Sequence, residues 1–228
     1  MTIATRFVSM LTAPARVFDD IREGRVGWVQ PWIIISVLYM IVTLLGLPVQ
    51  IALMELNPKN LPADMLDQQI RLMQMPLGLI WVALTPVGVL LIQMIVAGLT
   101  YLLVTILSQR ATFKQYLSLS FFTGIPAMLG QLLSVAILRA RGLERIMGPE
   151  DARMSFSLRA LAPPDSAVLK GVFGGFEFFT IWSLVLLGLG LQRVFGMSRA
   201  QAVAVLLPLW LIYVGMLILG EAFGGIGG

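Results

Sequence analysis

Five long apolar stretches dominate the chain, and Glu177 is the only charged residue inside them. About 20 apolar residues in helical form are enough to cross the hydrocarbon core of a bilayer. Lipid offers the backbone no hydrogen-bond partners, so such stretches must be helical. We therefore predict an all-α, polytopic transmembrane bundle. Its five spans are expected at about 28–53, 77–107, 116–138, 172–191 and 202–219.

The composition excludes most soluble and catalytic classes. Hydrophobic residues make up 58% of the chain and charged residues 12%, whereas a soluble domain carries about 25% charged residues. Such a surface cannot be solvated by water, so lipid must surround most of it. Cysteine and histidine are both absent. Their absence excludes Cys/His zinc sites, haem ligation through His and a nucleophile served by a His base.

No motif of nucleotide or metal chemistry occurs in the sequence. It has no GxxxxGK[ST] loop, no GxGxxG fingerprint and no HExxH. No predicted span contains an aspartate, which argues against intramembrane aspartyl proteolysis. We therefore expect no enzymatic activity, no cofactor, no metal and no nucleotide partner.

A basic pI of 9.9 does not indicate nucleic-acid binding in this chain. The 16 Lys and Arg exceed the 12 Asp and Glu only modestly, and the excess lies in the connections between spans. Basic connections set membrane orientation. No basic run with interleaved aromatic residues occurs, so we expect no nucleic-acid partner.

The N-terminal segment, residues 1–27, is predicted to be a cytoplasmic amphipathic region. Its apolar residues recur at helical spacing, and Pro14 interrupts them, which indicates one helix or two short ones. We favour an interfacial helix lying on the membrane, with packing on the protein's own cytoplasmic loops as the alternative. The apolar face comprises Ile3, Phe7, Met10, Leu11, Val17, Phe18 and Ile21. At the other end, residues 220–228 are expected to be a flexible, glycine-rich tail.

The orientation depends on two short basic turns. With a cytoplasmic N-terminus, each side of the membrane would hold eight Lys and Arg. However, turns 108–115 and 192–201 are both basic and free of acids, whereas connection 139–170 spreads its basic residues over a long segment. Short loops near span ends dominate orientation. We therefore predict a multi-pass protein with a cytoplasmic N-terminus and a periplasmic C-terminus.

Small residues mark the expected helix contacts. Gly171 and Gly175 form a GxxxG pair at the start of the fourth predicted span. Gly188 lies near the end of the same span, and Gly124 lies in the third span. Small residues let helix backbones approach closely in lipid. We favour packing within the bundle over a homodimer face.

Glu177, Gln131 and Gln93 form the candidate intramembrane polar site. An ionised carboxylate in hydrocarbon costs several kcal/mol unless it is paired, hydrated or protonated. Glu177 is interpreted either as a carboxylate reaching the interface or capping a polar seam, which we favour, or as a transport or proton-relay group. We expect it to face the bundle interior, with Gln131 as the first candidate partner.

Several stretches together resemble the bacterial branch of the YIP (Ypt/Rab-interacting protein) domain family. They are PARVFDDI at 14–21, ATFKQYL at 111–117, FFTGIP at 121–126, FFTIWSLVLLGLGL at 178–191 and SRAQA at 198–202. The resemblance implies a five-span integral membrane protein with a cytoplasmic N-terminus and an exoplasmic C-terminus. It transfers no catalytic residue, and the long polar N-terminal region of the eukaryotic members is missing, so Rab binding is not carried over.

These observations predict a non-enzymatic integral scaffold or membrane-organising protein of the bacterial inner membrane. The alternative is a transporter, or an accessory subunit of one, for a lipid or other amphiphile, with Glu177 in a polar site. Expected partners are membrane lipids, other membrane proteins or further copies of the chain. A polar cavity joining Gln93, Gln131 and Glu177 would favour the alternative.

The orientation can be tested directly because the chain has no native cysteine. Single cysteines at Asp64 and Ser155 should react with an impermeant thiol reagent in intact cells. Cysteines at Thr112 and Ser198 should react only after lysis, because the basic turns stay on the cytoplasmic side. The reverse labelling pattern would overturn the predicted orientation.

Overall fold

The computed structural model describes residues 2–56, 63–74, 76–107, 112–146 and 156–224. Within these residues, five helical segments are long and apolar enough to cross a membrane, which confirms the predicted all-α bundle. Four of them are single helices, namely α3 (Val29–Leu56), α5 (Pro76–Ile106), α9 (Phe178–Phe195) and α10 (Arg199–Gly224). The fifth combines α6 (Phe113–Thr123) with α7 (Ile125–Arg141) across a break at Gly124.

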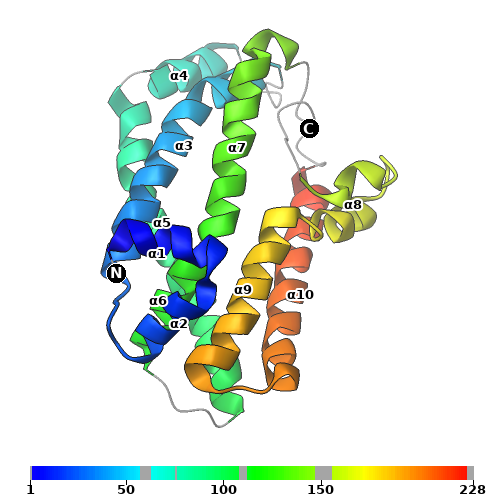
Figure 1. The fold of residues 1–228 in the computed structure, drawn as a ribbon. Helices are drawn as coiled ribbons and strands as arrows, with labels where there is room; N and C mark the ends of the chain where they lie inside the picture. The colour runs from blue at the N-terminus through cyan, green and yellow to red at the C-terminus, as the bar shows by residue number, and fades with distance from the viewer. Residues whose placement is uncertain (1, 57–62, 75, 108–111, 147–155, 225–228) are drawn as a thin grey trace.

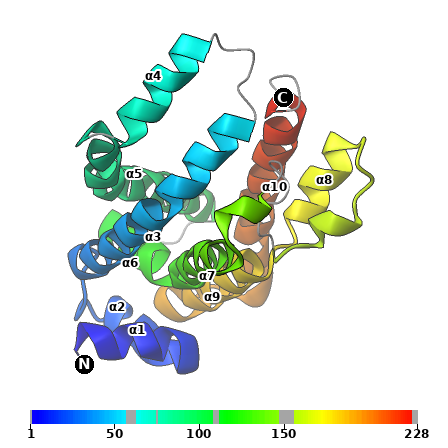
Figure 2. The ribbon, with the colours of Figure 1, turned by 90° about the horizontal axis from the view of Figure 1, so that it is seen from above.

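Short helices lie at one end of the bundle and along its side (Figures 1 and 2). One end carries α4 (Ala63–Gln74), the 3₁₀ turns η1 (Leu143–Arg145) and η2 (Leu158–Leu161), and α8 (Ala167–Gly174). Helices α1 (Ile3–Thr12) and α2 (Pro14–Arg22) lie beside the half of the bundle that is farther from α4 and α8. Helix α4, which contains Asp64, thus lies at the end opposite to the starts of α6 and α10, which follow Thr112 and Ser198 (Figure 1). Ser155 is outside the described residues.

The fourth span begins later than the sequence indicated. Instead of one helix over 172–191, α8 ends at Gly174 and α9 begins at Phe178. Two consecutive glycines disfavour helix continuation, and Glu177 acts as the N-cap of α9. The tail also differs from expectation, because residues 220–224 continue α10; residues 225–228 lie outside the described chain.

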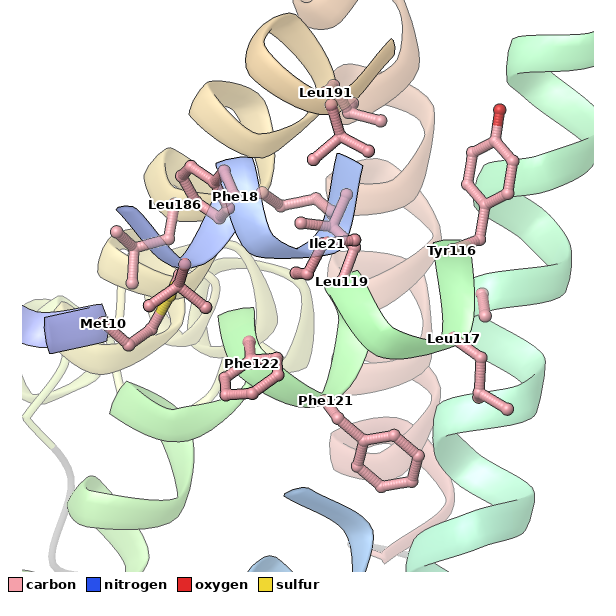
Figure 3. Close-up of a cluster of buried hydrophobic side chains, with 14 of the residues drawn as sticks. Met10, Phe18, Ile21, Tyr116, Leu117, Leu119, Phe121, Phe122, Leu186 and Leu191 are labelled. Atoms are coloured by element: carbon pink, nitrogen blue, oxygen red, sulfur yellow. The ribbon is translucent and has the colours of Figure 1, made fainter. Parts of the chain in front are cut away.

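The protein itself covers the apolar face of the N-terminal segment. Met10, Val17, Phe18 and Ile21 are almost completely buried. Figure 3 shows Met10, Phe18 and Ile21 packed among side chains of the spans. The predicted occupant of this face was lipid, but α6 and α9 occupy it instead. Helical periodicity reveals that a face must be buried, and it does not identify the surface that buries it.

Charged hydrogen bonds fix α1 and α2 in this position. The Asp20 carboxylate accepts from Arg6 Nε at 2.9 Å and from Arg25 Nε at 2.8 Å. The Arg6 and Asp20 side chains are only 10% and 9% exposed. Arg193, in the last turn of α9, donates to both carboxylate oxygens of Asp19, at 2.8 and 3.0 Å. These contacts join α1, the end of α2 and the end of α9.

Helix α6 is enclosed as a consequence of this docking. All eight residues from Tyr116 to Thr123 are buried. A helix that is buried on every side belongs to the core of a protein. The docked α1–α2 pair therefore makes α6 the most enclosed part of the third span.

The predicted packing glycines lie at close helix contacts. A Cβ at Gly171 would stand 2.7 Å from the backbone nitrogen of Ile218, and one at Gly175 would overlap Val214 Cγ2, both on α10. At Gly188 it would meet Leu206 at 2.8 Å, again on α10. At Gly124 it would meet Gln93 Nε2 at 3.0 Å. The GxxxG pair thus packs within the chain.

We expect Asp20→Asn to destabilise the protein by about 3–5 kcal/mol, because it leaves the buried Arg6 without a full counter-charge. Glu23→Gln is the control: its side chain is 45% exposed, and such surface pairs contribute about 0–1 kcal/mol. Thermal unfolding in detergent measures both. Equal melting temperatures for the two variants would contradict this role of Asp20.

The same carboxylate predicts acid sensitivity. Burial opposes ionisation of Asp20, but the hydrogen bonds from Arg6 and Arg25 outweigh it and hold the pKa below its usual 3.8. A carboxyl with a lowered folded-state pKa stabilises the fold above the unfolded pKa and loses that contribution as pH falls below it. The wild-type melting temperature should therefore drop between about pH 5 and pH 3, and Asp20→Asn should flatten this drop.

Gly171→Ala should destabilise the bundle by about 1–3 kcal/mol, because the added methyl group has to displace the backbone of α10. Gly215→Ala is the matched control: this helical glycine has no atom within 4 Å of an added Cβ. Alanine favours a helix over glycine by about 0.5–1 kcal/mol, so the control should be neutral or stabilising. A similar loss of melting temperature in both would argue against close α8–α10 packing.

Candidate functional site

A polar cleft of about 370 Å³ lies between α3 and α7 on one side and η2, α9 and α10 on the other. It occupies the half of the bundle nearer to α4 and α8, since it is lined by the second half of α3 and the start of α9. The lining combines amide, hydroxyl and charged groups with aliphatic side chains. Its polar members are Gln50, Gln131, Ser134, Arg159, Glu177, Thr180 and Tyr213.

The cleft lies where α7 continues toward α4 beyond the start of α9 at Phe178 (Figure 1). At the contact between α7 and α9, a Cβ on Gly130 would lie 2.6 Å from the Phe179 ring, so the helices are as close as glycine allows. There the Ala127 N–H donates to Ser183 Oγ at 3.3 Å. The main hydrophobic core, which includes Leu119 and Leu186, fills the bundle on the far side of the contact. The contact therefore forms the closed end of the cleft.

Exposed amides line the wall formed by α3 and α7. Gln50 and Gln131 are both exposed, and both line the cleft. Among the described residues, neither amide has a hydrogen-bond partner. Ser134 differs, since its hydroxyl donates to the Gly130 carbonyl at 2.8 Å. This wall therefore presents unused donors and acceptors to whatever fills the cleft.

The opposite wall carries the charges. Glu177 Oε2 accepts from the Thr180 backbone N–H at 2.6 Å, which caps the first turn of α9. Arg159, in η2, donates to Glu221 Oε2 of α10 at 2.9 Å, with both side chains largely buried. The Phe178 N–H donates to the Phe156 carbonyl at 3.0 Å, which attaches η2 to the start of α9. These bonds hold Arg159 and Glu177 on one rigid wall.

Known proteins place the chain in a family. Residues 8–220 match the Yip1 domain. The chain belongs to the Yip1 domain family. It is also 25% identical over 223 residues to Membrane protein YknW of Bacillus subtilis (strain 168), covering 95% of this chain and 88% of that protein. No solved structure matches it. The resemblance predicted from the apolar motifs is thereby confirmed.

In this Yip1-family protein, the three predicted polar residues do not form one site. Gln131 and Glu177 line the same cleft, although the hydrogen bond of the Glu177 side chain goes to Thr180 rather than to Gln131. Gln93 lies elsewhere: its side-chain amide is near Gly124, and its backbone carbonyl accepts from Ser120 Oγ at 3.4 Å. Sequence gives the depth of a polar residue in a span, but not the direction it faces.

Sequence reasoning missed several lining residues of the Yip1-family cleft. Gln50 was available as a third amide within a predicted span but lies close to the end of α3. Nothing in the sequence distinguished Tyr213 from an ordinary aromatic residue of the fifth span. Arg159 stood in a long connection, and nothing in the sequence indicated that this connection folds against α8 and reaches α9 and α10 through hydrogen bonds of Phe156 and Arg159.

Proposed function

We propose that this Yip1-family chain is a non-enzymatic, membrane-organising protein that holds the polar part of a lipid or other amphiphile in its cleft. One observation carries the proposal: Gln50 and Gln131 are exposed inside the cleft and have no hydrogen-bond partner among the described residues. The proposed setting is the bacterial inner membrane with the N-terminus cytoplasmic, so the cleft would open toward the outer leaflet.

Unpaired amides require a polar occupant. Gln131 belongs to the candidate span Phe113–Arg141 and lies well inside it. Acyl chains cannot satisfy an amide, and each unsatisfied polar group in hydrocarbon costs several kcal/mol. Water or the polar group of a bound molecule must therefore occupy the cleft. A lipid is the nearest molecule that brings such a group to this depth.

The shape and lining of the cleft suit an amphiphile. Its volume of about 370 Å³ lies within the range of small-molecule sites, about 300–1,000 Å³. Aliphatic side chains such as Val49, Leu53, Val135 and Leu138 stand beside the polar ones. A headgroup could pair with the amides and charges while the attached chain follows the apolar strip toward the surrounding lipid.

A scaffold without a ligand is the second candidate, and one observation favours it. Glu177 has a structural task as the N-cap of α9, so its presence does not by itself require a ligand.

A transporter, or an accessory subunit of one, would use the same cleft as the outer half of a pathway. In that case the α7–α9 contact at Gly130 would have to open.

Gln131→Leu separates these functions. If the cleft binds a polar headgroup, the variant should retain roughly tenfold less lipid, since one lost hydrogen bond of about 1.4 kcal/mol corresponds to a factor of ten. If the cleft has no ligand, removing an unpaired amide should leave lipid retention unchanged and stabilise the protein. Lipids retained after gentle-detergent purification are counted by native mass spectrometry.

Gln93→Leu is the matched control for Gln131→Leu. It removes an amide from another span, outside the cleft. Its lipid retention should equal that of the wild type. Unchanged retention in both variants would contradict the proposed function and leave the scaffold as the better candidate.

A further inference from the structure

We propose that the cleft selects a zwitterionic lipid headgroup with a primary ammonium, and that this ammonium binds the Glu177 carboxylate. Phosphatidylethanolamine is the representative of this class. The inference deepens the proposed function and rests on it, because it assumes that the cleft holds an amphiphile. It adds the chemistry by which the amphiphile is recognised.

The charges of the cleft leave Glu177 without a counter-ion. Among the residues that the structure describes, the charged side chains that line it are Arg159 and Glu177. Arg159 pairs with Glu221 at 2.9 Å, so its charge is already balanced. Among the described residues, no Lys or Arg forms an ion pair with Glu177. The unbalanced charge at the cleft is therefore negative, and it favours a cationic group over an anionic one.

The Glu177 carboxylate also has unused hydrogen-bonding capacity. From the described part of the chain it accepts one bond, from the Thr180 N–H at 2.6 Å, whereas a carboxylate offers about four lone-pair sites. A carboxylate enclosed by membrane helices is costly unless it is paired. A bound cation would supply both the missing charge and the missing donors.

The surrounding acceptors match an ammonium with N–H groups. The amide oxygen of Gln131 and the hydroxyl of Tyr213 line the same cleft as Glu177. A primary ammonium carries three N–H donors, one for each of these groups. A quaternary choline has no such donors and depends on aromatic cages. At this cleft the Phe156 ring packs edge-on against Phe179, with ring centroids 5.3 Å apart. This pair of rings does not form an aromatic cage.

Arg159 lies on the wall that carries Glu177, where its guanidinium donates to Glu221 at 2.9 Å. It therefore supplies no counter-charge to Glu177. An anionic headgroup without an amine would leave Glu177 unpaired.

The test is lipid competition on the full-length protein. Protein is equilibrated with an equimolar mixture of phosphatidylethanolamine, phosphatidylcholine and phosphatidylglycerol, and the retained lipids are counted by native mass spectrometry. We expect the wild type to retain phosphatidylethanolamine about tenfold over each of the other two. Glu177→Gln should abolish this preference while remaining folded, and Glu177→Asp, which keeps the charge and a good N-cap, should restore much of it.

The outcomes distinguish this inference from the proposed function. Equal retention of the three lipids by the wild type would overturn headgroup selection but leave amphiphile binding intact, provided that Gln131→Leu still reduces retention. Retention that no cleft variant changes would overturn both. A preference that survives Glu177→Gln would overturn the role of Glu177.

A water-soluble competitor identifies the source of the ammonium. O-phosphoethanolamine has the same headgroup without acyl chains. We expect it to displace phosphatidylethanolamine only at a concentration at least a hundredfold higher, because the apolar strip also binds the lipid chain. Displacement at equal concentration would overturn a lipid as the ligand and point to a free phosphoamine.

Discussion

The close approach of α7 and α9 at Gly130 determines much of the rest of the structure. Apolar side chains gain nothing by leaving lipid for one another, so membrane helices associate where small residues permit dense packing. At Gly130 the Phe179 ring occupies the space that a side chain would need. Below this level the helices and the N-terminal pair enclose a packed core. Above it α7 continues beyond the start of α9, and the polar cleft lies between α3 and α7 on one side and η2, the start of α9 and α10 on the other.

The two halves of the bundle therefore have different physical characters. The half beside α1 and α2 is closed by aromatic and aliphatic packing, with α6 buried on every side. The other half contains amides, hydroxyls and an acid between its helices. A membrane protein that only filled lipid space would have no use for this second half. Its polar groups are the reason to seek a ligand there.

The N-terminal helices show how charge and packing cooperate. Phe18 and Ile21 contribute buried apolar area, which is not directional. Asp20 and Asp19 then fix the orientation through paired hydrogen bonds from arginines. Removal of either contribution would leave the other insufficient to define one position, since a lone amphipathic pair could equally lie on lipid.

The sequence by itself determined the solvent, the helical class and the number of spans, because the scarcity of charge and the backbone's need for partners in lipid permit few alternatives. The family followed from the resemblance of particular sequence stretches. The sequence also placed Gln131 and Glu177 within apolar segments. Tertiary structure alone decided that these two residues share a cleft, that Gln93 does not, and that Arg159 returns from a distant connection to join them. It also decided that protein, not lipid, covers the N-terminal face. The reason is physical: periodicity and hydropathy report how strongly each residue avoids water, whereas rotation about a helix axis and the path of a connection depend on contacts between segments far apart in the chain.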